Sequence, residues 1–177
     1  MKRVLLLASI ASMSPSVLGS SAPTRRAATS DDTAILRDFD DFVGADLGCA
    51  QLAVERGHAK EVRDFAKVLV SEHGMAHQLA RDAATQMSVT LRSPSDNPRR
   101  AEHEKVLKSL RERLDVAFDV LFVRHEVEYH RDLVEHINKE WMPAAKSADL
   151  SALLSQAGPA FEAHATMAEE LQKSRAP

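Results

Sequence analysis

The sequence predicts an all-α protein built as an antiparallel four-helix bundle. Aromatic residues make up only 5% of its 177 residues, and there are only 6 glycines, which favours helices over a sheet. Apolar residues recur at three-to-four spacing through four long segments, and no useful stretch alternates in the manner of a strand. Because brief connections join these segments, neighbouring helices are expected to run antiparallel.

Local signals place the ends of each helix. The expected helices cover residues 32–56, 59–87, 101–113, 115–141 and about 148–173, the third being a short extra helix before the third long one. Ser30 and the two acids after it suit a helix start, and Gly57 suits a stop. Residues 91–100 form the clearest loop, and Pro143 ends the third long helix. Pro159 predicts a kink in the last helix.

The N-terminus is expected to be an export signal rather than part of the fold. Lys2 and Arg3 precede an apolar run over residues 4–13, and a region of small residues follows over residues 19–22. The run is short for a membrane span, so an uncleaved anchor is the less favoured alternative. We therefore expect a signal peptide at residues 1–22, a linker at 23–30 and a bundle at 31–175. This organisation predicts a periplasmic or cell-envelope protein with no integral span after cleavage.

Charge and composition exclude some functions. Without Lys2 and Arg3 the 23 basic residues become 21 against 26 acidic ones, so nucleic-acid binding is not expected. The single Cys49 lies on an apolar helical stripe and is interpreted as a small buried hydrophobe. The sequence contains neither a nucleophile motif with a positioned base nor a phosphate loop, and it identifies no protein partner. Whether the protein is an enzyme therefore stays open.

Each long helix carries one polar residue within its apolar stripe. These residues are Asp46, His73, His130 and His164. Asp46 and His130 lie about three turns before the ends of their helices, and the other two about four turns after the starts of theirs. In an antiparallel bundle such positions share one height, so the four side chains are expected to converge. Glu126, one turn before His130, can face the same space.

Two interpretations of this cluster stay open. Imidazole and carboxylate groups suit a transition-metal ion such as zinc, iron, manganese or copper. Alternatively, the same groups form a hydrogen-bonded polar network in a structural or stress-linked interaction protein. Oxidoreductase chemistry at a metal is a weaker third interpretation.

The remaining histidines have less specific roles. His77 lies one turn after His73 and can replace it, while His125 lies on a flank. Three others lie near helix ends or off the stripes and are expected to be solvated: His58, His103 and His136.

Three segments resemble a bacterial exported family called domain of unknown function 4142. VRDFAKVLVSEHGMA (residues 62–76), FDVLFVRHEVEYH (residues 118–130) and GPAFEAHATMAEEL (residues 158–171) are similar to its ordered motifs, and Asp46 stands where the family usually has glutamate. The resemblance covers about residues 33–171. It implies a ferritin-like fold and supplies no activity.

The resemblance does not extend to ferritin chemistry. A ferritin-type di-iron site uses Glu-x-x-His on two helices. Val70 stands three residues before His73, and Phe161 stands three before His164. Ferroxidase or storage activity is therefore not expected.

Overall fold

The computed structural model describes residues 30–91 and 98–174. Its helices are α1 (Ser30–Arg56), α2 (Lys60–Met87), α3 (Pro98–Arg111), α4 (Asp115–His136), α5 (Met142–Ala144) and α6 (Ala148–Ser174), with a π-helical turn, η1 (Ile137–Trp141), between α4 and α5. The predicted signal peptide and all of the linker except Ser30 lie outside the described residues. None of the described helices combines the length and apolar character that a membrane span requires.

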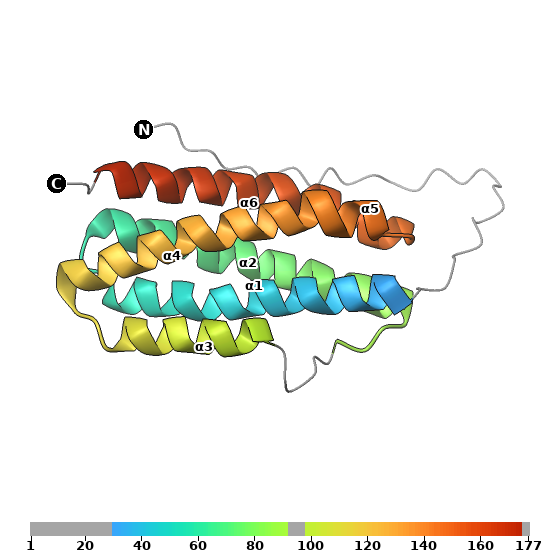
Figure 1. Ribbon diagram of the computed structural model, residues 1–177, viewed down its shortest axis with the longest axis horizontal. Coiled ribbons are helices and arrows are strands. Elements are labelled where there is room, and N and C mark those ends of the chain that lie inside the picture. Colours follow the sequence, from blue (N-terminus) through green and yellow to red (C-terminus); the bar gives the residue numbers. More distant parts are fainter. Residues whose placement is uncertain (1–29, 92–97, 175–177) are drawn as a thin grey trace, which may run out of the picture.

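The four long helices form the predicted antiparallel bundle (Figure 1). α1 packs against α2 and α4, and α6 packs against the same two helices from the other side. Because α2 and α4 run in the same direction, the chain must return between them. The short helix α3 makes that return along α1. The predicted fold class, including the extra helix before the third long one, is confirmed.

The helix ends differ from expectation at two places. α3 begins at Pro98, inside the predicted loop, because proline is well tolerated in the first turn of a helix. The third long helix continues through the π-helical turn η1, and Pro143 lies inside the first turn of the short α5 that follows. α6 includes Pro159 within one continuous helix.

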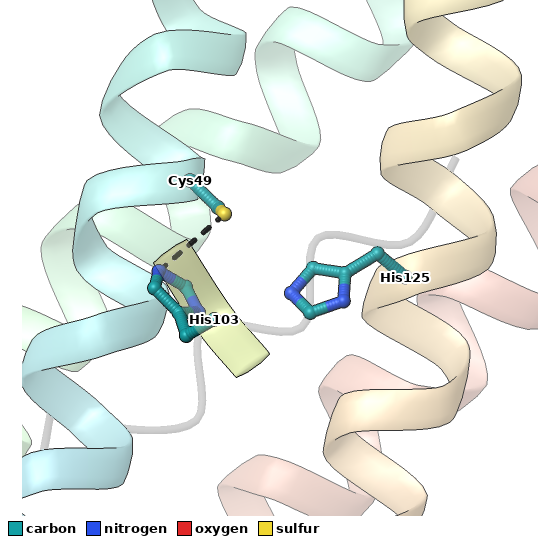
Figure 2. A group of neighbouring side chains, drawn as sticks. All are labelled: Cys49, His103 and His125. Carbon is teal, nitrogen blue, oxygen red and sulfur yellow. Dashed lines mark hydrogen bonds between the residues drawn. The ribbon is translucent and has the colours of Figure 1, made fainter. Parts of the chain in front are cut away.

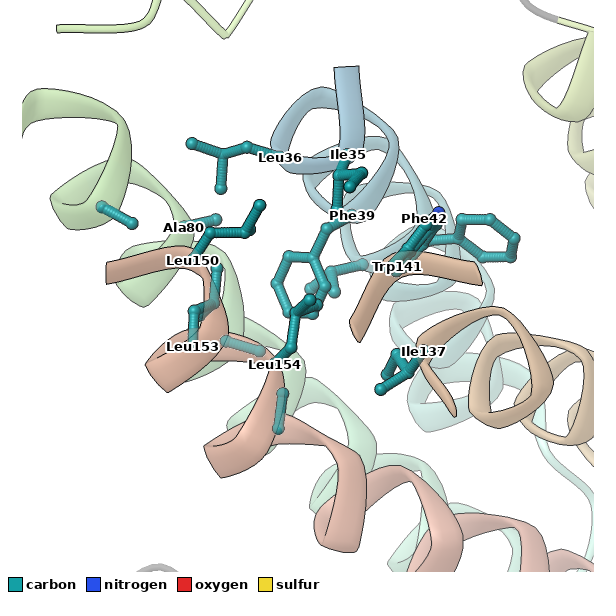
Figure 3. Packing of buried hydrophobic residues seen from close by; sticks show 14 of the residues in the cluster. Ile35, Leu36, Phe39, Phe42, Ala80, Ile137, Trp141, Leu150, Leu153 and Leu154 are labelled. Carbon is teal, nitrogen blue, oxygen red and sulfur yellow. The ribbon is translucent and has the colours of Figure 1, made fainter. Parts of the chain in front are cut away.

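Two apolar clusters fill the bundle and leave a polar layer between them. Figure 3 shows part of the first cluster, with Phe39 and Trp141 in its interior. The Phe39 ring packs against the rings of Trp141 and Phe161. The second cluster surrounds Phe65 and Phe122 near the other end. Along all four long helices, the predicted polar residues lie between the positions that contribute to the two clusters. Their convergence is therefore built into the order of residues along each helix.

The expected phase of α4 was wrong over its first two turns. The three-to-four spacing of Val120, Val123 and Val127 predicts all three on the core stripe, but Val120 is 51% exposed, while Asp119 and Phe122 are buried. The Asp119 carboxylate accepts hydrogen bonds from the backbone N–H groups of His58 and Ala59, each at 2.8 Å. These N–H groups lie at the start of α2, where the N-cap residue is Ala59 and its side chain makes no capping hydrogen bond. The buried face of this part of α4 is therefore the one that carries Asp119, which caps the start of α2.

A second buried carboxylate joins the ends of two helices. Asp32 in the first turn of α1 accepts hydrogen bonds from the backbone N–H groups of Lys146 at 2.7 Å and Ser147 at 3.2 Å. These N–H groups precede α6 and would otherwise lack helical partners. Asp32 and Asp119 are therefore structural acids at opposite ends of the bundle.

Candidate metal centre

All five residues predicted for the polar cluster lie together in the layer between the apolar clusters. Asp46 comes from α1, His73 from α2, Glu126 and His130 from α4, and His164 from α6. Each is fully buried, with 0% of its surface exposed. The three imidazole rings have centroids 5.0 to 5.2 Å apart. Every long helix therefore contributes at least one polar group to one buried point.

His73 and His130 face each other through their Nε2 atoms, which lie 3.2 Å apart. His130 Nδ1 lies 3.0 Å from the backbone carbonyl oxygen of Glu126. Because a carbonyl only accepts, Nδ1 of His130 carries the proton and its Nε2 keeps a lone pair. His73 Nε2–H then donates to that lone pair, and His73 Nδ1 lies 3.1 Å from a carboxylate oxygen of Asp46.

His164 is oriented by an acid that the periodicity did not identify. Its Nε2 lies 2.7 Å from Glu72 Oε2, so Nε2–H donates to the carboxylate. Its Nδ1 keeps a lone pair, and this atom is buried without a hydrogen-bond partner. Glu72 directly precedes His73 and lies off the core stripe, so its sequence position suggests only a solvated residue.

Burial disfavours the charged forms of the Asp46 and Glu126 carboxyl groups. Burial raises the pKa of Asp46 to about 7. Burial, together with the nearby Asp46, raises the pKa of Glu126 well above its usual range. As carboxylates, neither side chain has a hydrogen-bond donor. When one of them holds a proton, the two become hydrogen-bond partners, so the pair shares a proton near neutral pH.

The histidines of the centre are in the form that binds metals. Burial lowers the pKa of His73 to about 3, helped by the nearby His164. Burial, with His164 and His73, also lowers the pKa of His130 well below its usual range. Both rings are therefore neutral at pH 7, and a neutral imidazole can offer its unprotonated nitrogen to a metal ion.

The donor atoms fit a metal ion. One ligand atom each from His73, His130 and His164 lies within 4.8 Å of the other two, and the same is true of Asp46, Glu126 and His130. The carboxylate oxygens of both acids, with Nδ1 of His73 and of His164, are buried without hydrogen-bond partners. Such atoms cost free energy when left unsatisfied, and a bound cation would satisfy several of them together.

The other histidines depart in part from expectation. His58 is exposed, as predicted, but His103 is only 8% exposed because α3 lies against α1. The side chain of His136 is also largely buried, since its ring packs against an aromatic cluster. His77 lies 2.8 Å from the Asp40 carboxylate and does not replace His73.

The comparisons with known proteins agree with the fold and assign no activity. Residues 18–171 match the model of the family described as "Domain of unknown function (DUF4142)". No curated protein matches the sequence. A solved structure, a DUF305 fragment from Deinococcus radiodurans, superposes with a TM-score of 0.75 at 14% identity, covering 84% of this chain and 99% of that one. At this identity the likeness shows a shared helical fold.

Proposed function

The chain belongs to the DUF4142 family, and we propose that it binds a transition-metal ion in the buried centre between its four long helices. One observation carries this proposal. In each ring of His73, His130 and His164 one nitrogen lies beside an oxygen atom, and one ligand nitrogen from each ring lies within 4.8 Å of the other two. Metal-binding histidines in proteins characteristically have this second contact, which fixes the ring and its tautomer.

The contacts assign the ligand atoms. His73 and His130 would bind through Nε2, because their Nδ1 atoms lie against Asp46 and the Glu126 carbonyl. For His73 this requires the tautomer with its proton on Nδ1, facing Asp46, in place of the Nε2–H form that bonds to His130 in the metal-free centre. His164 would bind through Nδ1, because its Nε2 is held by Glu72.

The two acids would balance the charge of the ion. On binding a divalent cation, Asp46 and Glu126 would release their shared proton, and their two carboxylates would then neutralise the ion inside the apolar bundle. Either carboxylate can also serve as a further ligand, since both lie beside His130.

A pocket adjoins the centre on one side. A pocket of about 220 Å³ lies between α2 and α6 and is lined by Glu72, Phe161 and His164 among others. Glu72 is 18% exposed at its side chain, so it can meet an incoming cation before His164 does. This pocket supports reversible exchange of the ion rather than permanent enclosure.

The donor set narrows the class of ion that the centre would bind. Three imidazoles with carboxylates suit zinc, iron, manganese or copper, and disfavour hard ions such as magnesium, which prefer oxygen ligands.

The basic and apolar N-terminus favours an exported protein of the periplasm or cell envelope. We therefore propose a metal-binding envelope protein, and the absence of Glu-x-x-His at His73 and His164 argues against ferritin-type iron oxidation.

A metal-free polar network is the second candidate. It is favoured by the direct approach of His73 Nε2 to His130 Nε2, which is an acceptable hydrogen bond between neutral rings. The proton shared by Asp46 and Glu126 adds a further hydrogen bond to this network. In this account the layer fixes the alignment of the helices and binds nothing.

Metal analysis separates the two candidates. Protein without a histidine tag is incubated with zinc, iron, manganese or copper, desalted, and analysed for bound metal. The metal-site account predicts that the wild type retains about one more ion per chain than His130→Ala does, and as many as His58→Ala, the matched exposed histidine. Equal retention of all four metals by the folded wild type and His130→Ala would favour the polar network.

A further inference from the structure

A second cluster of metal-ligating side chains lies beside the candidate centre. Figure 2 shows Cys49 of α1, His103 of α3 and His125 of α4 gathered around one space. The Cys49 Sγ lies 3.6 Å from His103 Nε2, and one ligand atom from each residue lies within 4.8 Å of the other two. Three helices thus bring a thiol and two imidazoles together.

These side chains are buried and incompletely partnered. Cys49 is fully buried, and His103 and His125 are only 8% and 9% exposed. Nδ1 of His103 and Nε2 of His125 have no hydrogen-bond partner. The ring of His125 extends from α4 toward the other two residues (Figure 2). Packing a polar ring here without a partner is unfavourable, so the arrangement points to a ligand.

We propose that Cys49, His103 and His125 form a second metal site, selective for a thiophilic ion such as Zn(II) or Cu(I). The donor set carries this assignment, because thiolate sulfur favours these ions and imidazole accepts both. On binding, the S–H bond of Cys49 breaks, a sulfur–metal bond forms and one proton leaves to solvent. The first centre has no sulfur ligand, so the two sites differ in the ions that they prefer.

The metal-free cluster is neutral. Burial raises the pKa of the Cys49 thiol, helped by the acids of the first centre. Burial lowers the pKa of His125 to about 4 and that of His103 below its usual range. The thiol therefore stays protonated and unreactive until a metal replaces its proton, and both imidazoles have a free lone pair.

An acidic pocket leads to this cluster. A pocket of about 440 Å³ between α1 and α3 is lined by His103 and by three carboxylates, Asp40, Asp41 and Glu104. Carboxylates around a concave surface raise the local concentration of cations. Since His103 belongs both to the pocket wall and to the cluster, an ion attracted to the pocket reaches the site at that residue. The short helix α3 therefore supplies both a proposed ligand, His103, and a carboxylate of the pocket wall, Glu104.

Cobalt titration tests the site, because Co(II) replaces Zn(II) and reports sulfur ligation by a charge-transfer band in the near ultraviolet. The titration uses the folded protein without a histidine tag, and Zn(II) or Cu(I) is added afterwards to displace the cobalt. We expect a sulfur-to-cobalt band whose plateau corresponds to one cobalt–thiolate centre per chain and that Zn(II) or Cu(I) abolishes. No such band in the folded wild type with excess Co(II) would overturn the proposal.

Matched variants separate this site from the first. Cys49→Ser should abolish the band, and His103→Gln and His125→Gln should weaken cobalt binding by at least about tenfold. His164→Gln, which alters only the first centre, should keep the band, so the two proposals fail independently. Circular dichroism checks that each variant is folded, and the two histidine variants decide the matter if Cys49→Ser does not fold. A band that both histidine variants leave unchanged would contradict the proposed ligand set.

Discussion

The Nε2 atoms of His73 and His130 lie 3.2 Å apart at the middle of the bundle, on helices far apart in the sequence. Two nitrogens that bind one tetrahedral zinc ion at about 2.0–2.1 Å are about 3.3 Å apart. The pair is therefore spaced as two ligands of one ion would be.

Glu72→Gln should weaken metal binding at the first centre by about 10- to 100-fold. Glu72 holds Nε2 of His164, and losing its charge leaves that ring less well oriented and less basic. A competition titration with a zinc chelator measures the change, with the exposed Glu55→Gln as control. Equal affinity in the two variants would mean that Glu72 does not support the centre.

Asp46→Asn should change stability in opposite directions with and without metal. Burial raises the pKa of Asp46 to about 7, so above that pH the metal-free protein must keep an unfavourable buried charge. The amide removes this cost, and the metal-free variant should unfold at a higher urea concentration at pH 8 than the wild type. With metal bound the order should reverse, because the carboxylate then balances the ion. A parallel shift in both states would contradict this role.

The metal-free protein should lose stability as the pH falls from about 6.5 toward 4. His73 and His125 have pKa values lowered to about 3 and about 4, so in this window the unfolded chain binds protons that the folded chain does not. The raised carboxyl pKa values act in the opposite direction. Four histidines with lowered pKa values outnumber the three acids with raised ones among the described residues: His73, His103, His125 and His130 against Asp40, Asp46 and Glu126.

Urea unfolding in the presence of a chelator at several pH values measures this dependence. The histidine account expects a smaller loss in His125→Gln, which removes one of the buried bases. A stability that rises on acidification through this window would show that the carboxyls dominate instead.

Asp119→Ala should destabilise the fold by about 1–3 kcal/mol without affecting the metal centre directly. The change removes the acceptor for two backbone N–H groups at the start of α2. Thermal unfolding compared with Asp82→Ala, an exposed acid on α2, measures the difference. A loss no larger than that of Asp82→Ala would argue against the capping role.

The first centre was predictable because each long helix interrupts its apolar stripe only briefly and at a matching height. Asp46, His73, His130 and His164 stand out on this basis, and Glu126 follows from its spacing to His130. Glu72 does not, since it lies off the stripe and its role depends on the direction of the His164 ring. Periodicity identified the burial of Cys49, which the structure confirms.

The second cluster required the three-dimensional arrangement. His103 belongs to a short helix with a weak apolar pattern, and only the return of α3 along α1 buries it beside Cys49. The error at Val120 has a related cause. The exposed face of early α4 is the one opposite Asp119, whose carboxylate accepts hydrogen bonds from backbone N–H groups about sixty positions away, at the start of α2. Local periodicity contains no information on such contacts.

The central claim is that the three histidines of the first centre bind one ion. A crystal structure of the protein soaked with zinc, with anomalous data collected at the zinc edge, tests it most directly. The account predicts an anomalous peak about 2.0–2.1 Å from Nε2 of His73, Nε2 of His130 and Nδ1 of His164. A fully soaked crystal with no anomalous peak between these rings, and with the His73–His130 hydrogen bond intact, would contradict it.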